Sequence, residues 1–435
     1  MKRKGQTGRR GIAALLAALM LVLSPGGLVQ AKTSEILASE VIAWEDAEKA
    51  ATASLNQKDA KIITDATAEE TAPESGTEQV QENIAQEKAP FVSTGKTLVI
   101  AHRGASTVAP EDTIAAFLEA KRLGADGYET DIQITKDGKL VAQHNYTIDG
   151  NSNGSGYVHD LTLEELKTFD FGAWKDERYK GETIVTVEEC LAKAGDFQVI
   201  NLEIKAPQKM RDVYVQELAT ALEKSGLTDR IIVSSFDAAI LKELKELAPD
   251  VRTGLLTVAE MSFLYIPLVP LCIPTDKPVN EIKKEELKIP GFATFLMSIG
   301  IRGATPEDVG MELLGTISGM FPGATWDEIS EEILKQRELV SYVDSLDFQP
   351  DYLHCEFGAL LRIPELVDEM HKRGIGVNVW TPNTESELTQ AFAFHPDGVI
   401  TDEPALALRI RKKYDPVEDV LQRLLDWLQG RRVHP

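Results

Sequence analysis

The chain has 435 residues and a formal net charge of −23 at pH 7. That length holds one large α/β domain of roughly 250–350 residues with appendages, or two ordinary domains. The acidic balance argues against a nucleic-acid partner, because binding a phosphate backbone requires clustered lysine and arginine side chains. A local basic pocket for a single phosphate group remains compatible with this composition.

Residues 1–31 predict an export signal. Basic residues precede an apolar run at 12–23, and Val29-Gln30-Ala31 provides a small-residue cleavage site. The apolar run is too short to cross a bilayer, which takes roughly 20 residues. We therefore expect cleavage after Ala31, with a retained anchor as the alternative. The protein is then exported, and is either extracellular or associated with the cell envelope.

The segment 32–92 is an acidic, low-complexity stretch rich in Ala, Glu, Thr and Gln, with little periodic apolar content. Such a composition buries too little surface to offset its ordering entropy, so we predict a disordered or partly helical spacer. The three cysteines, Cys190, Cys272 and Cys355, are widely spaced and odd in number. We expect buried thiols, with a single disulfide as the alternative.

From residue 97 onward, short apolar runs alternate with amphipathic stretches, which is typical of a parallel-sheet α/β fold. The pattern favours a distorted TIM (β/α)8 barrel over 93–408, rather than a doubly wound sheet. The predicted strands are 97–101, 127–134, 139–143, 199–204, 230–235, 251–256, 351–355, 376–380 and 397–401. The predicted helices include 113–123, 209–225, 238–247, 362–373 and 384–394.

The connection at 135–138 is too short to join two parallel strands. The strands at 127–134 and 139–143 should therefore form a hairpin or a bent continuation, which leaves eight barrel strands from nine predicted ones.

Two segments interrupt the alternation, and a third follows it. The turn-rich loop 146–182 is long enough to suggest a functional role. The stretch 258–345 is a mainly helical insertion whose apolar run at 263–274 we expect to pack as a small cap. The segment 409–435 is predicted to contain an amphipathic helix that docks on the barrel. For both 258–345 and 409–435, peripheral contact with a membrane is the alternative.

Glu129 and Asp131 lie two positions apart in a predicted strand, so their side chains leave the same face. Two adjacent carboxylates are costly to bury unless they share a cation. Their oxygen ligands indicate one divalent cation, Ca²⁺ or Mg²⁺, and make zinc less suitable. A barrel-interior ion pair is the plain structural alternative.

Further polar side chains follow other apolar runs. Glu203 adds a third carboxylate and Lys205 an ammonium on the same strand face, while His102, Arg103 and His144 also stand at strand ends. Barrel active sites lie at the carboxyl ends of the strands, so these residues can meet in space. Imidazoles serve as acid and base, and cations stabilise phosphoryl charge, which together predict phosphodiester hydrolysis.

These motifs resemble those of the glycerophosphodiester phosphodiesterase family, which is related to barrel phosphodiesterases of the phosphatidylinositol-specific phospholipase C type. The resemblance covers about 97–257 and 348–408. It is carried, in the family order, by His102-Arg103-Gly104, Ala109-Pro110-Glu111-Asp112-Thr113, 124–131 (GADGYETD), Thr135-Lys136-Asp137-Gly138, His144, Glu203-Ile204-Lys205, Val233-Ser234-Ser235-Phe236, Val379-Trp380-Thr381 and Thr401-Asp402-Glu403-Pro404.

The resemblance implies hydrolysis of glycerophosphodiesters to sn-glycerol 3-phosphate and an alcohol. It implies a Ca²⁺ or Mg²⁺ ion on Glu129, Asp131 and Glu203, acid/base catalysis by His102 and His144, and phosphate contacts from Arg103 and Lys205. It leaves open which histidine is the base, and whether a water or the glycerol 2-hydroxyl attacks phosphorus. Trp380 stands near a strand end, where it either lines the glycerol pocket or fills the barrel.

This sequence departs from the family pattern at several positions. Asn145 follows His144 where the family has Asp, Asp112 replaces the usual Asn, and Val185 replaces the usual Pro. The loss of a carboxylate beside His144 removes an orienting group.

Two alternative functions therefore stand beside the leading one. The first is a lysophospholipase D-like or teichoic-acid phosphodiesterase, and the second is a catalytically impaired envelope protein that binds glycerol phosphate groups.

Overall fold

The computed structural model describes residues 96–193, 195–205, 210–258, 273–287, 314–315, 317, 320–321 and 323–414. The predicted signal at 1–31, the spacer at 32–92 and most of the predicted C-terminal helix lie outside the described residues. Among the helices that are described, none is long and apolar enough to cross a membrane.

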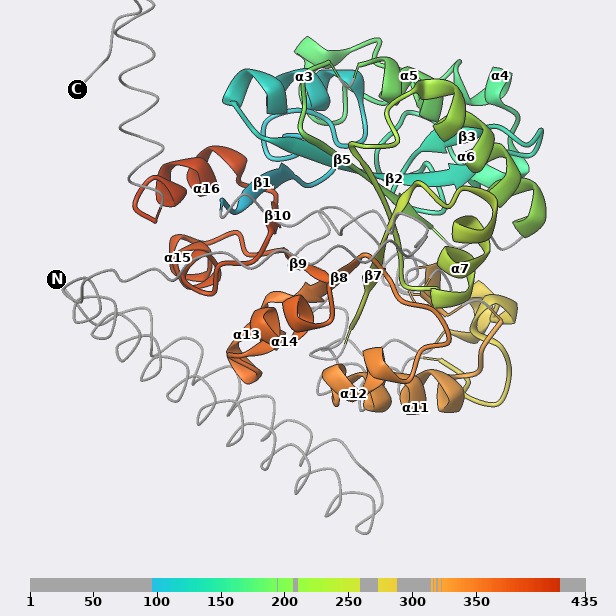
Figure 1. The fold of residues 1–435 in the computed structure, drawn as a ribbon. Coiled ribbons are helices and arrows are strands. Elements are labelled where there is room, and N and C mark those ends of the chain that lie inside the picture. The colour runs from blue at the N-terminus through green and yellow to red at the C-terminus, as the bar shows by residue number, and fades with distance from the viewer. Residues whose placement is uncertain are drawn as a thin grey trace, which may run out of the picture.

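Eight parallel strands close into a barrel surrounded by helices (Figure 1). Around the barrel the order is β1, β2, β5, β6, β7, β8, β9 and β10, and β1 pairs with both β2 and β10. The strands are β1 (Leu98–Ala101), β2 (Gly127–Ile134), β5 (Val199–Ile204), β6 (Ile231–Ser235), β7 (Arg252–Leu256), β8 (Tyr352–Glu356), β9 (Gly376–Trp380) and β10 (Gly398–Thr401). The predicted TIM barrel is confirmed.

The distortion of the barrel lies beside β2, as the short connection predicts. β3 (Leu140–Ala142) pairs antiparallel with the end of β2. The turn is closed by a hydrogen bond from Thr135 N–H to the Lys139 carbonyl at 2.8 Å. A further antiparallel strand, β4 (Val185–Thr186), extends this ribbon and was not predicted, because two residues carry no readable alternation.

The helices cover the outside of the barrel. They are α3 (Ile114–Leu123), α4 (Leu163–Leu166), α5 (Val187–Ala192), α6 (Arg211–Ser225), α7 (Ala238–Leu247), α11 (Trp326–Gln336), α12 (Leu339–Asp344), α13 (Phe357–Arg362), α14 (Leu366–Lys372), α15 (Glu385–Ala393) and α16 (Pro404–Arg411). The helix predicted over 362–373 is confirmed as α14, but it begins only at Leu366, because Pro364 separates it from α13. Proline lacks an N–H donor and disfavours helical backbone at Ile363 before it.

The core between strands and helices is closely packed. The rings of Phe117 from α3 and Tyr128 from β2 stack with centroids 4.3 Å apart, and both side chains are fully buried. Burying an aromatic side chain of this kind contributes roughly 1.5–3 kcal/mol. Cys190 is a buried free thiol and Cys355 is also buried, in line with the predicted buried thiols, while Cys272 lies outside the described residues.

The described parts of the insertion 258–345 are mainly helical. They include the short turns η5 (Val279–Glu281) and η6 (Lys284–Glu286), followed by α11 and α12. In Figure 1, α11 and α12 lie beside each other at the bottom of the view. The proposed boundary after residue 408 falls inside α16, which runs on to Arg411.

Candidate active site

Three buried carboxylates meet at the carboxyl end of β2 and β5. Glu129 and Asp131 leave the same face of β2, and the parallel register pairs Asp131 with Glu203 on β5. One oxygen from each of the three side chains lies within 4.8 Å of the others. The structure therefore brings together all three residues that the sequence proposes as metal ligands.

Two cations lie against this carboxylate cluster. Lys205 Nζ is 2.9 Å from Asp131 Oδ1 and 2.6 Å from Glu203 Oε1, and Arg103 Nε is 3.2 Å from Asp131 Oδ2. Both Asp131 oxygens lack the alignment of a hydrogen bond, so these contacts to Asp131 are electrostatic. Burial by itself raises the pKa of Asp131, but Lys205 and other positive neighbours hold that pKa below its usual range.

Glu129 is the least compensated member of the cluster. Its Oε2 accepts the Arg103 backbone N–H at 2.9 Å, whereas its buried Oε1 has no hydrogen-bond partner among the described residues. Burial, followed by the charges of Asp131 and Glu203, raises the pKa of Glu129 well above its usual value. An uncompensated buried oxygen within an all-oxygen donor set fits a hard divalent cation such as Ca²⁺ or Mg²⁺.

His102 stands beside a carboxylate that the sequence analysis did not assign to the site. The β1–β10 register pairs Ala101 with Thr401, so the next residues, His102 and Asp402, are neighbours. His102 Nδ1 lies 2.7 Å from Asp402 Oδ1, and Nε2 lies 3.9 Å from Glu129 Oε2. Burial tends to raise the pKa of Asp402, but the hydrogen bond with His102 brings it below its usual range.

Asp402 is itself held in place from two sides. Asn383 Nδ2 donates to Asp402 Oδ2 at 2.5 Å, and Ser106 Oγ donates to Asp402 Oδ1 at 3.2 Å. The signal for this residue was present in the Thr401-Asp402-Glu403-Pro404 motif at the end of the last strand. In a closed barrel the last strand lies beside the first, so Asp402, directly after β10, comes next to His102, directly after β1.

His144 follows β3 and faces the same cluster. Its Nδ1 lies 2.7 Å from Asn145 Oδ1, so the side-chain amide oxygen of Asn145 is the hydrogen-bond acceptor for this ring. Burial, followed by the charges of Arg103 and Lys205, lowers the pKa of His144 well below its usual value. The ring is therefore neutral, with its proton on Nδ1 and a lone pair on Nε2.

Gln133 fixes the segment that carries His144, and sequence reasoning missed it. Its Nε2 lies within hydrogen-bond distance of three successive carbonyls, those of Gln143 at 2.7 Å, His144 at 3.2 Å and Asn145 at 2.7 Å, and its two N–H groups are shared among them. The Gln143 N–H in turn donates to the Asp131 carbonyl at 2.8 Å. This antiparallel pairing, which a regular barrel lacks, carries the histidine to the mouth of the barrel.

Arg103 turns sharply after β1. Its φ of 54° is left-handed, and Gly104 follows with φ of 76°. A Cβ at Gly104 would lie 2.6 Å from the Ala116 Cβ, so only glycine fits there. Glu111 Oε1 lies 3.3 Å from Arg103 Nη1 and holds the guanidinium beside Asp131. Burial by itself lowers the pKa of Arg103. The negative charges of Glu111 and Asp131 outweigh this effect and raise the pKa above its usual value, so the guanidinium stays charged.

Trp380, the last residue of β9, lies across the mouth from the carboxylate cluster. Its Nε1 donates to the His354 carbonyl at 3.0 Å, and its ring meets Phe236 edge to face with centroids 5.9 Å apart. Trp380 is half-buried and packs against apolar side chains inside the barrel, including Ile100 and Ile400. It therefore fills part of the barrel while also forming a wall of the mouth.

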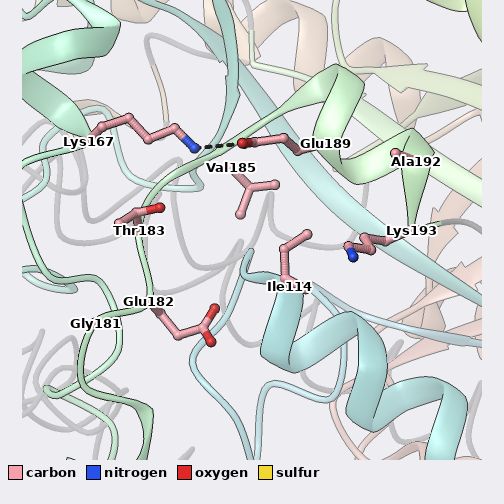
Figure 2. Close-up of a pocket in the computed structure, with 9 residues that line it drawn as sticks. All are labelled: Ile114, Lys167, Gly181, Glu182, Thr183, Val185, Glu189, Ala192 and Lys193. Atoms are coloured by element: carbon pink, nitrogen blue, oxygen red, sulfur yellow. Dashed lines mark hydrogen bonds and ion pairs between the residues drawn. The ribbon is translucent and has the colours of Figure 1, made fainter.

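A separate cavity of about 280 Å³ lies on the outside of the barrel (Figure 2). Ile114 of α3, Val185 of β4 and residues of α5 line it, and Lys167 pairs with Glu189 across it at 2.7 Å. None of the predicted catalytic, phosphate or metal residues lines this cavity. The cluster at the carboxyl ends of the strands, and not this cavity, is therefore the candidate active site.

Three buried carboxylates, two cations and two imidazoles meet at the carboxyl end of a TIM barrel, and this arrangement is typical of a phosphodiesterase. Comparison with protein-family models agrees: residues 102–264 and 317–406 match the glycerophosphoryl diester phosphodiesterase family. The chain belongs to this family, and its class of enzyme is glycerophosphodiester phosphodiesterase.

Individual relatives support the assignment. A glycerophosphodiester phosphodiesterase of Caldanaerobacter subterraneus subsp. tengcongensis is 45% identical over 162 residues, which cover 37% of this chain and 67% of the relative. One from Bacillus subtilis is 32% identical over 214 residues, covering 46% and 69%. A crystal structure of a candidate family member from Silicibacter pomeroyi has a TM-score of 0.51 at 20% identity, over 76% of this chain and 97% of that one, and supports the fold.

Proposed function

We propose that this protein hydrolyses glycerophosphodiesters to sn-glycerol 3-phosphate and an alcohol, with one bound Ca²⁺ or Mg²⁺ ion and two histidines as acid and base. Family membership supports the reaction class. The observation that carries the finer proposal is the convergence of Glu129, Asp131 and Glu203 with both histidines at one end of the barrel.

The charge of the cluster suits an anionic diester. Glu129, Asp131 and Glu203 bring three negative charges when ionised, and Arg103 and Lys205 bring two positive ones. A divalent cation held by the three carboxylates turns the net charge of this group from one negative to one positive. When bound, the ion supplies stabilisation of the charge on the phosphoryl oxygens. Arg103 and Lys205 add further positive charge to the same site.

His144 is the general base in this proposal. Its hydrogen bond to Asn145 Oδ1 leaves the Nε2 lone pair for the proton of the attacking hydroxyl. Burial, together with the positive charges of Arg103 and Lys205, lowers the pKa of His144 and so disfavours a proton on its ring before the reaction. The proton thus moves from the nucleophile, a water or the glycerol 2-hydroxyl, to Nε2 of His144.

His102 is the general acid. Asp402 holds Nδ1, so the opposite nitrogen, Nε2, points to the carboxylate cluster and delivers a proton to the leaving alkoxide. The negative charge of Asp402 balances the charge of the protonated ring. Asn145 Oδ1 accepts a hydrogen bond from His144 Nδ1, so this histidine keeps an orienting partner, and this supports an active enzyme over an impaired binding protein.

The test is the release of sn-glycerol 3-phosphate from glycerophosphocholine by the full chain. The chain is stripped with EDTA and then assayed with Ca²⁺, with Mg²⁺ and with neither. We expect release only with a metal ion, and loss of release in His102→Ala, His144→Ala and Glu129→Gln. His395→Asn and Glu164→Gln, which change exposed side chains of the same types, are the matched controls and should keep the activity.

Absence of release with either metal, from protein shown to be folded by circular dichroism, would contradict the proposal. It would shift weight to a lipid or polymer substrate or to a binding protein. Release that survives EDTA would contradict the metal requirement alone.

We also propose that the protein is exported, because residues 1–31 have the pattern of a signal peptide. N-terminal sequencing of the protein recovered outside the cell or from the envelope, with cleavage after Ala31, would support this. Recovery of an intact N-terminus inside the cell would contradict it.

A further inference from the structure

The described part of the insertion packs against the mouth of the barrel. We call the described residues between Ile273 and Gln336 the cap. Its core contains Ile317, Trp326 and Ile329, none more than 2% exposed. Phe236, which follows β6, and Trp380, at the end of β9, pack against this core. The cap therefore rests on the carboxyl ends of the strands, which is the end that carries the active site.

The strand order divides the mouth into two halves. The cluster that would hold the phosphate comes from β10, β1, β2 and β5, which are contiguous around the barrel. Phe236 and Trp380 belong to the other half, formed by β6, β7, β8 and β9. Val258, which follows β7, is also in the cap core, and its N–H donates to Gln336 Oε1 at 2.9 Å. A diester held by the cluster therefore has the cap on its far side.

A third contact reaches back to the catalytic half. Gly315 of the cap lies against the ring of Tyr146, two residues after His144, and a Cβ at Gly315 would come within 3.1 Å of Tyr146 Cδ2. Tyr146 is buried, and burial raises the pKa of its hydroxyl. An alkyl chain needs about 3.5–4 Å of clearance from each wall. The space between Gly315 and the Tyr146 ring is therefore too narrow for such a chain.

Much of the cap lies outside the segments that match the family model. The family model matches 102–264 and resumes at 317, so 265–316, which includes Ile273 and Gly315, lies outside the shared pattern. The catalytic cluster lies on matched segments. A feature that touches the mouth but lies outside the shared machinery is suited to choosing among substrates for one reaction.

We propose that the cap is the specificity element of this enzyme: Gly315 against Tyr146, and Phe236 with Trp380, limit the space beside the phosphate and exclude glycerophosphodiesters that carry an acyl chain. The proposal rests on the proposed function. An acyl chain would have to displace well-packed aromatic side chains, whereas a deacylated glycerol group and a small polar alcohol would not. The alternative, that the insertion guides lysophospholipids into the site, predicts the opposite selectivity.

The experiment compares glycerophosphocholine with 1-octanoyl lysophosphatidylcholine, kept below the concentration at which it aggregates. Both release choline, so one assay of the full chain with Ca²⁺ or Mg²⁺ reads both reactions. A group too large for its pocket costs roughly 10- to 200-fold in kcat/KM, and we expect at least that preference for glycerophosphocholine in the wild type. Phe236→Ala should narrow the preference roughly tenfold by raising kcat/KM for the lysophospholipid.

A second variant, Ile317→Ala, loosens the cap core without touching the mouth and should narrow the preference in the same direction, which guards against misfolding of Phe236→Ala. Trp174→Ala, which removes an exposed aromatic ring outside the cap, is the control and should leave the preference unchanged. Equal rates on both substrates in the wild type, or an unchanged preference in both folded cap variants, would overturn the proposal.

Failure of the proposed function gives a different result, namely no choline from either substrate. Competition binding of sn-glycerol 3-phosphate and 1-octanoyl lysophosphatidic acid then tests the cap directly. Selective binding of the deacylated ligand by the wild type, relaxed in Phe236→Ala, supports the cap. Equal binding of the two ligands refutes it.

Discussion

His102 Nδ1 lies 2.7 Å from Asp402 Oδ1, although the two residues are 300 positions apart in the chain. The contact exists because β10 closes the barrel against β1. A carboxylate on Nδ1 fixes the tautomer and the orientation of the ring, and so leaves Nε2 toward the substrate. Asp402 is thus a positioning residue that acts through His102.

Asp402→Asn should keep an acceptor beside Nδ1 but remove the charge. We expect kcat for glycerophosphocholine to fall roughly 10- to 100-fold, the usual cost of losing an orienting partner. KM should change little, because Asp402 does not touch the phosphate in the proposed arrangement. Steady-state kinetics with saturating metal check this. Asp212→Asn, an exposed position on α6, is the matched control. A raised KM with unchanged kcat would contradict the positioning role.

Gln133→Leu should remove the donor that holds three successive carbonyls around His144. Loss of the donor to buried acceptors costs about 1–3 kcal/mol of unfolding free energy. We also expect a fall in kcat, because the segment that carries His144 loses its anchor. Denaturant unfolding and kinetics measure the two effects. Gln216→Leu on the exposed face of α6 should change neither. A stability loss with full kcat would show that Gln133 is structural only.

The sequence predicted the centre of the site because strand periodicity carries it. Glu129 and Asp131 have to share a face if 127–134 is a strand, and His102, Glu203 and Lys205 stand where apolar runs end. In a TIM barrel, residues at the carboxyl ends of the strands meet whatever their distance in sequence. The convergence of these side chains at one end of the barrel was therefore predictable from the sequence, while their roles remain part of the proposal.

The supporting residues were not readable, since their roles depend on register and on side-chain reach. Asp402 needs the closing β1–β10 pair, and Gln133 looks like any polar strand residue until its amide meets three carbonyls. Pro364 marks the break before α14 in the sequence, but the apolar periodicity placed the start of the predicted helix at Arg362 instead of Leu366. The position of the cap depended on packing against Phe236 and Trp380, which composition does not reveal.

Asn145→Asp restores the carboxylate that the family pattern has directly after the residue equivalent to His144. A carboxylate near Nδ1 should raise the pKa of His144, typically by about 1–3 units for close opposite charges. The acid limb of the kcat profile, which reports protonation of the base, should then shift to higher pH. Activity profiles from pH 5 to 8 check this. Asn280→Asp adds the same charge at an exposed position and should leave the limb in place.

The lowered pKa of His144 also makes the stability of the fold depend on pH. In the wild type the pKa of His144 is lowered in the folded state, so the unfolded chain binds more protons as pH falls below its unfolded pKa of about 6.5. Stability from this group is therefore present above that pH and is lost below it. The loss should be smaller in Asn145→Asp. Identical acid limbs and identical stability profiles in the two proteins would mean that His144 is not the base assigned here.

Glu129→Gln should separate two effects of the carboxylate cluster: the loss of stability that its buried charges cause without metal, and the gain in stability when it binds a metal ion. Burial and neighbouring carboxylates raise the folded-state pKa of Glu129, so the metal-free wild type loses stability as pH rises above the unfolded pKa of about 4.5. In EDTA the variant should therefore melt higher than the wild type, and the gap should widen from pH 5 to pH 8. Glu164→Gln, which changes an exposed carboxylate, should show no such gap.

With bound Ca²⁺ or Mg²⁺, the wild type should instead melt at a higher temperature than Glu129→Gln. At 100 times its Kd a bound ion adds about 2.7 kcal/mol to the stability of the wild type. If Glu129→Gln weakens binding by about 100-fold, the same concentration adds only about 0.4 kcal/mol. Thermal unfolding with and without Ca²⁺ or Mg²⁺ measures both gains. An undiminished gain in Glu129→Gln would place the ion elsewhere. A variant that is less stable in EDTA would mean that Glu129 is compensated by a contact within the protein, which its unpartnered Oε1 argues against.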